Sequence, residues 1–271
     1  MKKIFKRFAW VLLLLGIGWA VHYAWVSFPI ISGYDAKQMC TCIFVSGMDK
    51  EYLEKHELAD FPLSLGSCKV DMQDSSVTCT VWGFAKKKAI YRKGIGCTLI
   101  NDITEKELRS QVFNIPPAPS LNTDTVPWPM GDKLIDSFPA SLSKEKLMAA
   151  VNKAFEEPYP DKKVRTRAVV VVYDRQLVAE QYAPGFSKDM KMYGWSMAKS
   201  VTAALTGTLV MQGKLDIKKP APVPEWKDSK DPRNKIALED LLQQQSGLNF
   251  KEDYTGASDV TNMLYKIDDM A

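Results

Sequence analysis

The sequence predicts an α+β protein in which helices pack against an antiparallel sheet, preceded by an apolar segment and a small β-rich domain. A charged helical pattern runs from Ser143 to about Glu157. Two apolar strand patterns follow at 167–174 and 176–182, and the first is expected to be buried on both faces. An apolar helical pattern then spans 197–212. This order of helix, hairpin and helix is typical of the beginning of an α+β domain.

Residues 1–32 indicate a membrane anchor. A basic run at 1–7 precedes an apolar stretch from Phe8 to Phe28, which has about the 20 residues needed to cross a bilayer. Lysine and arginine on the amino side favour a cytoplasmic amino terminus. We therefore expect a single-pass protein of the bacterial inner membrane, with the catalytic domain periplasmic or extracytoplasmic. An uncleaved anchor is favoured over a cleaved signal peptide because no small-x-small cleavage site ends the apolar stretch.

Residues 33–115 predict a small β-rich domain with a short helix near 49–55. Alternating residues at 66–84 predict a hairpin that turns at Gln73-Asp74. In that register Cys68 faces Cys79 at a separation that a disulfide bridges.

The remaining cysteines of this domain also favour disulfides. Cys40 and Cys42 are expected on the same side of a strand, so either one can pair with Cys97 and one thiol is left over. Five clustered cysteines fit an oxidising compartment. A metal site is disfavoured because no Cys-x-x-Cys pair or histidine cluster completes one.

A proline-rich linker at 116–140 separates this domain from a larger one at 141–271. Prolines are frequent from Ile115 to Pro129, which is typical of extended chain. The net charge of +4 gives no indication of a nucleic-acid partner, because part of it belongs to the membrane flank.

The residues that carry chemistry are predicted at the start of the apolar helix. Ser196 and Lys199 are three positions apart and therefore lie on one helical face. A lysine inside a helix that is apolar on most sides is expected to be buried, and burial favours the neutral amine, which is a base. The amine can then take the hydroxyl proton and make the serine oxygen nucleophilic. The competing interpretation is that Ser196 is only a helix N-cap.

Two further Ser-x-x-Lys pairs occur, Ser141 with Lys144 and Ser143 with Lys146. Both fall at the beginning of the charged helix, where serine is a favoured N-cap and lysine is a solvated residue. We therefore discard them as catalytic candidates.

An ordered set of motifs resembles one family, the beta-lactamase-related serine hydrolases, which belong with serine beta-lactamases and penicillin-binding proteins. The resemblance covers roughly 145–271 and is to the class C-like branch with 6-aminohexanoate-dimer hydrolases and carboxylesterases. Its motifs are Gly194-Trp-Ser-Met-Ala-Lys-Ser200, Gly213-Lys-Leu-Asp216, Pro222-Val-Pro-Glu-Trp226, Leu238-Glu-Asp-Leu-Leu242, Ser246-Gly-Leu248 and Glu252-Asp-Tyr254.

The resemblance implies an acyl-enzyme mechanism on a small-molecule amide, ester or lactam. We expect no cofactor, and a metalloprotein is disfavoured because clusters of metal ligands are lacking. Ser196 would be the nucleophile, Lys199 the general base, and Tyr254 a substrate contact. A loop tyrosine that packs only on its neighbours is the alternative for Tyr254. The alternative for the whole chain is a non-catalytic penicillin-binding or cell-wall sensor protein with the same fold.

The resemblance also implies that this chain is a fragment. The family's tyrosine-x-asparagine or serine-x-asparagine motif has no match after Lys199. The lysine- or histidine-threonine/serine-glycine strand, which supplies one oxyanion-hole amide, is also missing. We therefore expect the 271 residues to be inactive or nearly so on their own.

Overall fold

The computed structural model describes residues 2–117 and 120–268, and its mixture of helices and antiparallel strands confirms the predicted α+β class. The chain forms two compact units. Unit 1 comprises Met1–Val112 and Met192–Ala271, and unit 2 comprises Phe113–Lys191.

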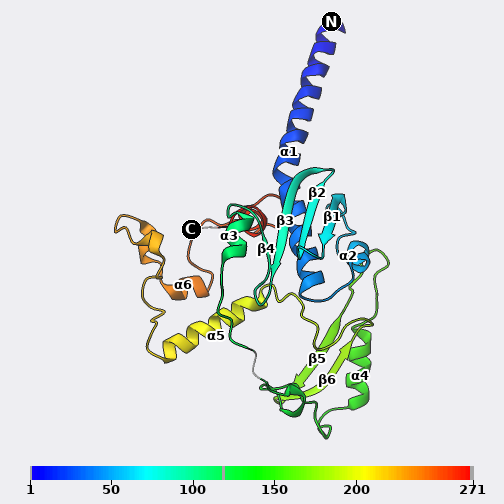
Figure 1. The fold of residues 1–271 in the computed structure, drawn as a ribbon, viewed down its shortest axis with the longest axis vertical. Helices are drawn as coiled ribbons and strands as arrows, with labels where there is room; N and C mark the ends of the chain where they lie inside the picture. Colours follow the sequence, from blue (N-terminus) through cyan, green and yellow to red (C-terminus); the bar gives the residue numbers. More distant parts are fainter. Residues whose placement is uncertain (1, 118–119, 269–271) are drawn as a thin grey trace. The chain divides into compact units, whose positions relative to one another are not determined.

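The elements of unit 1 come from both of its sequence segments (Figure 1). The first segment contains α1 (Lys2–Phe44), α2 (Lys50–His56), β1 (Gly66–Asp71), β2 (Ser76–Val81), β3 (Phe84–Arg92), β4 (Gly96–Leu99) and α3 (Glu105–Ser110). The second contains α5 (Met197–Met211), α6 (Leu238–Leu242) and α7 (Asp259–Tyr265).

The two halves of α1 have different surroundings. The large apolar side chains from Ile4 to Trp25 are exposed, and Trp25 is 81% exposed. In the second half, Ala36 and Met39 are fully buried. The predicted anchor at 8–28 lies mostly in the exposed half, and α1 is long and apolar enough to cross a membrane. The helix then continues past Pro29 and supplies the core of the adjoining domain.

The second half of α1 is covered by a four-stranded antiparallel sheet in the order β1-β2-β3-β4 (Figure 1). Apolar residues from α1, from α2 and from all but the first strand form the buried core, among them Met39, Leu53, Val77, Ala89 and Leu99. Gly66 permits the close approach of β1, because a Cβ atom at this position would lie 1.9 Å from Oδ2 of Asp35.

The predicted hairpin and its disulfide are confirmed. β1 ends at Asp71 and β2 begins at Ser76, so Gln73 and Asp74 form the turn. Cys68 and Cys79 are register partners and are joined by a disulfide, with their Cα atoms 4.1 Å apart.

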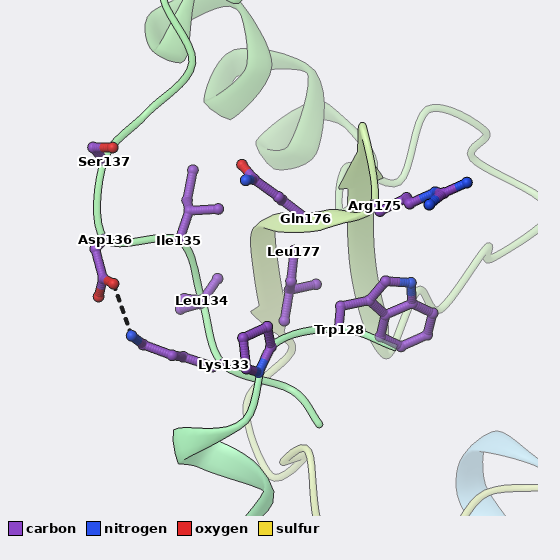
Figure 2. Close-up of a pocket in the computed structure, with 10 residues that line it drawn as sticks. Trp128, Lys133, Leu134, Ile135, Asp136, Ser137, Arg175, Gln176 and Leu177 are labelled. Carbon is purple, nitrogen blue, oxygen red and sulfur yellow. Dashed lines mark hydrogen bonds and ion pairs between the residues drawn. The ribbon is translucent and has the colours of Figure 1, made fainter. Parts of the chain in front are cut away.

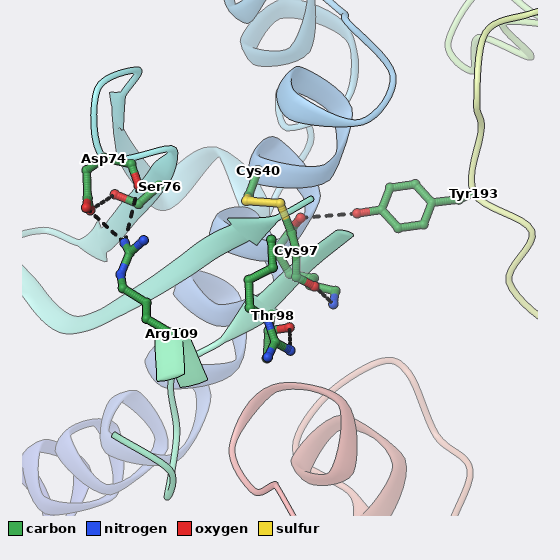
Figure 3. Close-up of a disulfide and its surroundings, with 9 residues drawn as sticks. Cys40, Asp74, Ser76, Cys97, Thr98, Arg109 and Tyr193 are labelled. Atoms are coloured by element: carbon green, nitrogen blue, oxygen red, sulfur yellow. Dashed lines mark hydrogen bonds and ion pairs between the residues drawn. A yellow bond between two sulfur atoms is a disulfide. The ribbon is translucent and has the colours of Figure 1, made fainter. Parts of the chain in front are cut away.

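The prediction that Cys40 and Cys42 lie on a strand is wrong, because both belong to α1. Side chains two positions apart on a helix point in nearly opposite directions, so only one of them can face Cys97. Cys40 forms that disulfide, across a Cα separation of 6.0 Å (Figure 3). Cys42 is buried as a thiol.

Unit 2 contains α4 (Lys144–Lys153), β5 (Ala168–Tyr173) and β6 (Gln176–Tyr182). The strands pair as an antiparallel hairpin whose turn is at Asp174 and Arg175, as predicted. Both turn residues have left-handed backbone, with φ of 45° and 61°. α4 begins at its predicted N-cap but ends at Lys153, four residues before the expected Glu157.

The prediction that the first strand of this hairpin is buried on both faces is wrong. Val170 and Val172 in β5 are 50% and 41% exposed, whereas Leu177, Val178 and Ala179 in β6 are buried. α4 packs against β6, and the described part of unit 2 forms a sheet of two strands only. One apolar strand therefore keeps a solvent-facing side.

Candidate active site

The structure brings Ser196 and Lys199 together at the beginning of α5. Lys199 Nζ donates a hydrogen bond to Ser196 Oγ over 3.0 Å, and both residues are exposed. Ser196 precedes the helix with helical backbone, φ −64° and ψ −10°, and its side chain makes no capping hydrogen bond. An N-cap serine normally has extended backbone and accepts from an amide of the first turn. The capping interpretation of Ser196 therefore does not fit this geometry.

A strained backbone precedes the serine. Trp195 has φ of +41°, a left-handed conformation that costs a residue with a side chain about 1–2 kcal/mol. The first turn then closes immediately, because the Met197 amide donates to the Gly194 carbonyl over 2.9 Å. Such strain is often found at functional sites. Here it produces a sharp turn that presents Ser196 at the exposed end of α5.

The chain that enters this turn is fixed to α1. The hydroxyl of half-buried Tyr193 donates to the Lys37 carbonyl over 3.1 Å (Figure 3). The Tyr193 ring stacks on Trp195 with a centroid separation of 5.5 Å. Burial raises the pKa of Tyr193, so this hydroxyl remains a donor at physiological pH. The contact holds the segment two residues before Trp195 on the covered half of α1.

Tyr254 lies on an exposed loop and is itself 61% exposed. Its hydroxyl donates to Glu252 Oε1 over 2.8 Å, and this hydrogen bond raises the pKa of Tyr254. The neighbouring Asp253 carboxylate accepts from the amide and the hydroxyl of Thr255.

Tyr254 and Trp195 line the same cavity, whose volume is about 430 Å³. Its wall also includes α1 residues from Tyr23 to Tyr34. The cavity therefore joins the residue before the candidate nucleophile, the candidate substrate contact and the helix of the predicted anchor. Sequence analysis missed it because its residues come from four separate segments of the chain.

The prediction that α5 is a buried helix is wrong for the described residues. Val201 and Leu205 are 60% and 63% exposed, and Lys199 is exposed as well. The apolar pattern correctly gave the helix and its end, where Gly213 adopts φ of +67°. The pattern does not tell whether another element covers the helix, and in the structure these side chains are exposed. Lys199 is therefore brought to Ser196 by helical spacing and not by burial.

The two discarded serines have other partners. Ser143 Oγ accepts from the Lys146 amide over 3.3 Å and caps α4, as predicted. Ser141 Oγ lies 3.3 Å from the Tyr173 hydroxyl.

A second cavity, of about 210 Å³, lies in unit 2 beside the β5–β6 turn (Figure 2). Its charged residues include Arg175 and the ion pair of Lys133 with Asp136, whose charged atoms are 2.7 Å apart. Ser137 also lines it, but no serine–lysine contact of the kind seen at Ser196 is found among its described residues. Across the described ranges, no cluster of His, Cys, Asp or Glu could hold a metal ion.

Comparison with known families concerns the segment that contains α5. Residues 145–268 match the family model described as Beta-lactamase. The match covers a little under half of the 271 residues and includes Ser196, Lys199 and Tyr254. It confirms the resemblance of this segment to the beta-lactamase-related serine hydrolase superfamily. Searches of curated proteins and of solved structures give no match.

The hydrogen bonding of Ser196 makes a testable prediction about stability. Ser196→Ala removes no cap, so we expect the free energy of unfolding to change by less than about 0.5 kcal/mol. Ser143→Ala removes a true N-cap and is expected to cost about 1 kcal/mol. Urea denaturation of both variants measures the difference. A loss of about 1 kcal/mol in Ser196→Ala would restore the capping interpretation.

Proposed function

We propose that this protein is a membrane-anchored serine hydrolase that cleaves an ester, amide or lactam through an acyl-enzyme. The main support is the 3.0 Å hydrogen bond between Lys199 Nζ and Ser196 Oγ, on a serine that does not cap its helix. The beta-lactamase family match to the same segment supports a hydrolase of this superfamily.

The geometry suits nucleophilic attack by serine. Lys199, as a neutral amine, takes the hydroxyl proton while Ser196 Oγ forms a bond to the substrate carbonyl carbon. The tetrahedral intermediate collapses by breaking the bond to the alcohol or amine, which takes the proton from Lys199. Water then attacks the acyl-serine and gives its proton to the same amine. The carboxylic acid leaves, and the proton returns to Ser196 Oγ.

Tyr254 is proposed as a substrate contact. Its phenol is exposed on the wall that it shares with Trp195, so the ring can cover a molecule bound near Ser196. Its hydroxyl already donates to Glu252, which fixes the orientation of the ring.

We also propose the localisation predicted from the sequence. The exposed apolar half of α1 would cross the bacterial inner membrane, and the remainder of the chain would lie in the periplasm. The two disulfides support this side, because disulfides form and persist in oxidising compartments. In this proposal, residues 1–32 form the anchor and residues 33–115 the small β-rich domain. Residues 116–140 form the linker, and residues 141–271 belong to the hydrolase domain.

The proposed nucleophile can be tested by covalent labelling. A fluorophosphonate should label the full-length protein at Ser196, with a new P–O bond, loss of fluoride and transfer of the serine proton to Lys199. Ser196→Ala should abolish the adduct, and Lys199→Ala should slow labelling by about 100- to 10,000-fold because the general base is lost. Intact-protein and peptide mass spectrometry measure both effects.

Ser141→Ala is the matched control and should be labelled at the wild-type rate. Labelling that persists in Ser196→Ala would mean that another residue is the nucleophile. Acylation by a β-lactam or ester with no release of product would instead indicate the non-catalytic binding protein.

The proposed topology predicts that protease added to intact spheroplasts digests the chain beyond residue 32. The exposed loops around Ser229 should be cut first, since regular structure is sparse there. Immunoblotting with an amino-terminal tag follows the products. If cleavage requires lysis of the spheroplasts, the orientation is the reverse of the one proposed.

A further inference from the structure

The 430 Å³ cavity is a mainly apolar site with one wall on α1. Tyr23, Phe28 and Ile31 line it from α1, and Leu65, Trp195 and Tyr254 line it from other segments. Its volume lies within the range of small-molecule pockets in proteins, about 300–1,000 Å³.

The position of the cavity on α1 relates it to the membrane. Tyr23 lies within the predicted span and is 54% exposed, whereas Ile31 lies beyond the span and is only 7% exposed. Eleven residues separate Tyr23 from Tyr34, which corresponds to roughly 16 Å along the helix axis. The cavity therefore begins in the last part of the span and continues into the covered half of the helix. A molecule leaving the bilayer surface along α1 would meet this opening.

The chemistry of the wall favours an apolar chain over an ionic head group. No lysine, arginine or histidine is found among the described lining residues, and Asp60 is the one charged side chain there. A phosphate or carboxylate would therefore lack a cationic partner and would meet a like charge. Ser27 Oγ is buried and makes no hydrogen bond in the structure. It is a neutral hydroxyl and brings no charge that could pair with an ionic head group. Methylene groups meet mainly aromatic and aliphatic surface.

Two tyrosine contacts to α1 fix segments that line the cavity. Tyr265 of α7 is buried, and its ring contacts Tyr34 of α1 with a centroid separation of 5.6 Å. One helical turn further along α1, the Tyr193 hydroxyl donates to the Lys37 carbonyl and fixes the chain two residues before Trp195. Trp195 lines the cavity and directly precedes Ser196 in the chain, so the cavity reaches the residue next to the proposed nucleophile.

We infer that this cavity binds the acyl chain of an amphiphilic ester or amide that reaches Ser196 from the membrane surface. The inference rests on the proposed function and specifies its substrate class as molecules with a long apolar acyl chain. Each methylene that is fully buried favours binding by roughly fourfold, so chain length should strongly affect the rate of acylation.

The test compares two fluorophosphonates, one with an ethyl chain and one with a dodecyl chain, on the full-length protein in lipid nanodiscs. The measured quantity is the ratio of the dodecyl to the ethyl labelling rate. Ser27→Trp fills the cavity and should lower this ratio at least tenfold. Ser229→Trp makes the same substitution on an exposed loop and should leave the ratio unchanged. The long probe partitions into the nanodisc to the same extent for every variant. This effect therefore cancels when the ratio of labelling rates is compared between variants.

Leu65→Trp fills the cavity from another segment of the chain. It provides a second cavity variant in case Ser27→Trp does not fold. Circular dichroism and the two intact disulfides identify folded protein. An unchanged ratio in both folded cavity variants would overturn the inference, even if Ser196 is labelled normally.

Absence of labelling by either probe in wild type would instead contradict the proposed function, and the cavity then has its own test. Ser196→Ala is photolysed in nanodiscs with dodecanoic acid methyl ester carrying a diazirine at the chain end. We expect crosslinks on peptides that contain Trp195 or Tyr254, and their loss in a double variant with Ser27→Trp. Crosslinks confined to residues 4–22 of α1 would show simple lipid contact and overturn the inference.

Discussion

The burial of the second half of α1 is the packing arrangement on which unit 1 depends. The same helix has an exposed apolar half suited to lipid and a half covered by β1 to β4, so its surroundings change within one continuous element. Cys40 links the covered half to β4 through Cys97. Tyr193 and Tyr265, more than 150 positions further along the chain, also pack on it. Through these contacts the segment that contains Ser196 is held against α1.

This arrangement explains how a strained turn can persist at an exposed position. The left-handed conformation of Trp195 is disfavoured by itself, but Tyr193 fixes the preceding chain on α1 and the first turn of α5 fixes the chain that follows. Ser196 is thereby presented with a hydroxyl that accepts from Lys199 and does not cap the helix. The chemistry of the site depends on local helical spacing, whereas its position depends on long-range packing. Figure 1 shows α5 as a separate helix, in keeping with the exposure of Val201 and Leu205.

The features that depend on local spacing along the chain were predictable from the sequence. The pairing of Cys68 with Cys79 follows from a two-residue period, the contact of Ser196 with Lys199 from a helical turn, and the end of α5 from Gly213. Cys40 was misassigned because Cys-Thr-Cys-Ile-Phe-Val has high strand propensity, which the continuation of α1 overrides. The exposure of β5 and α5, the conformation of Trp195 and the cavity all depend on which elements pack together. No short-range pattern encodes that information.

Chemical rescue tests the role of Lys199 most directly. In Lys199→Ala, a small primary amine such as propylamine can occupy the space of the lost side chain and take the proton of Ser196. The proposed mechanism predicts that the slow acylation of this variant by a fluorophosphonate increases in proportion to the concentration of neutral amine. It also predicts that Ser196→Ala stays unlabelled at every concentration. An acylation rate of Lys199→Ala that does not respond to amine, in a folded protein with both disulfides intact, would contradict the assignment of Lys199 as the general base.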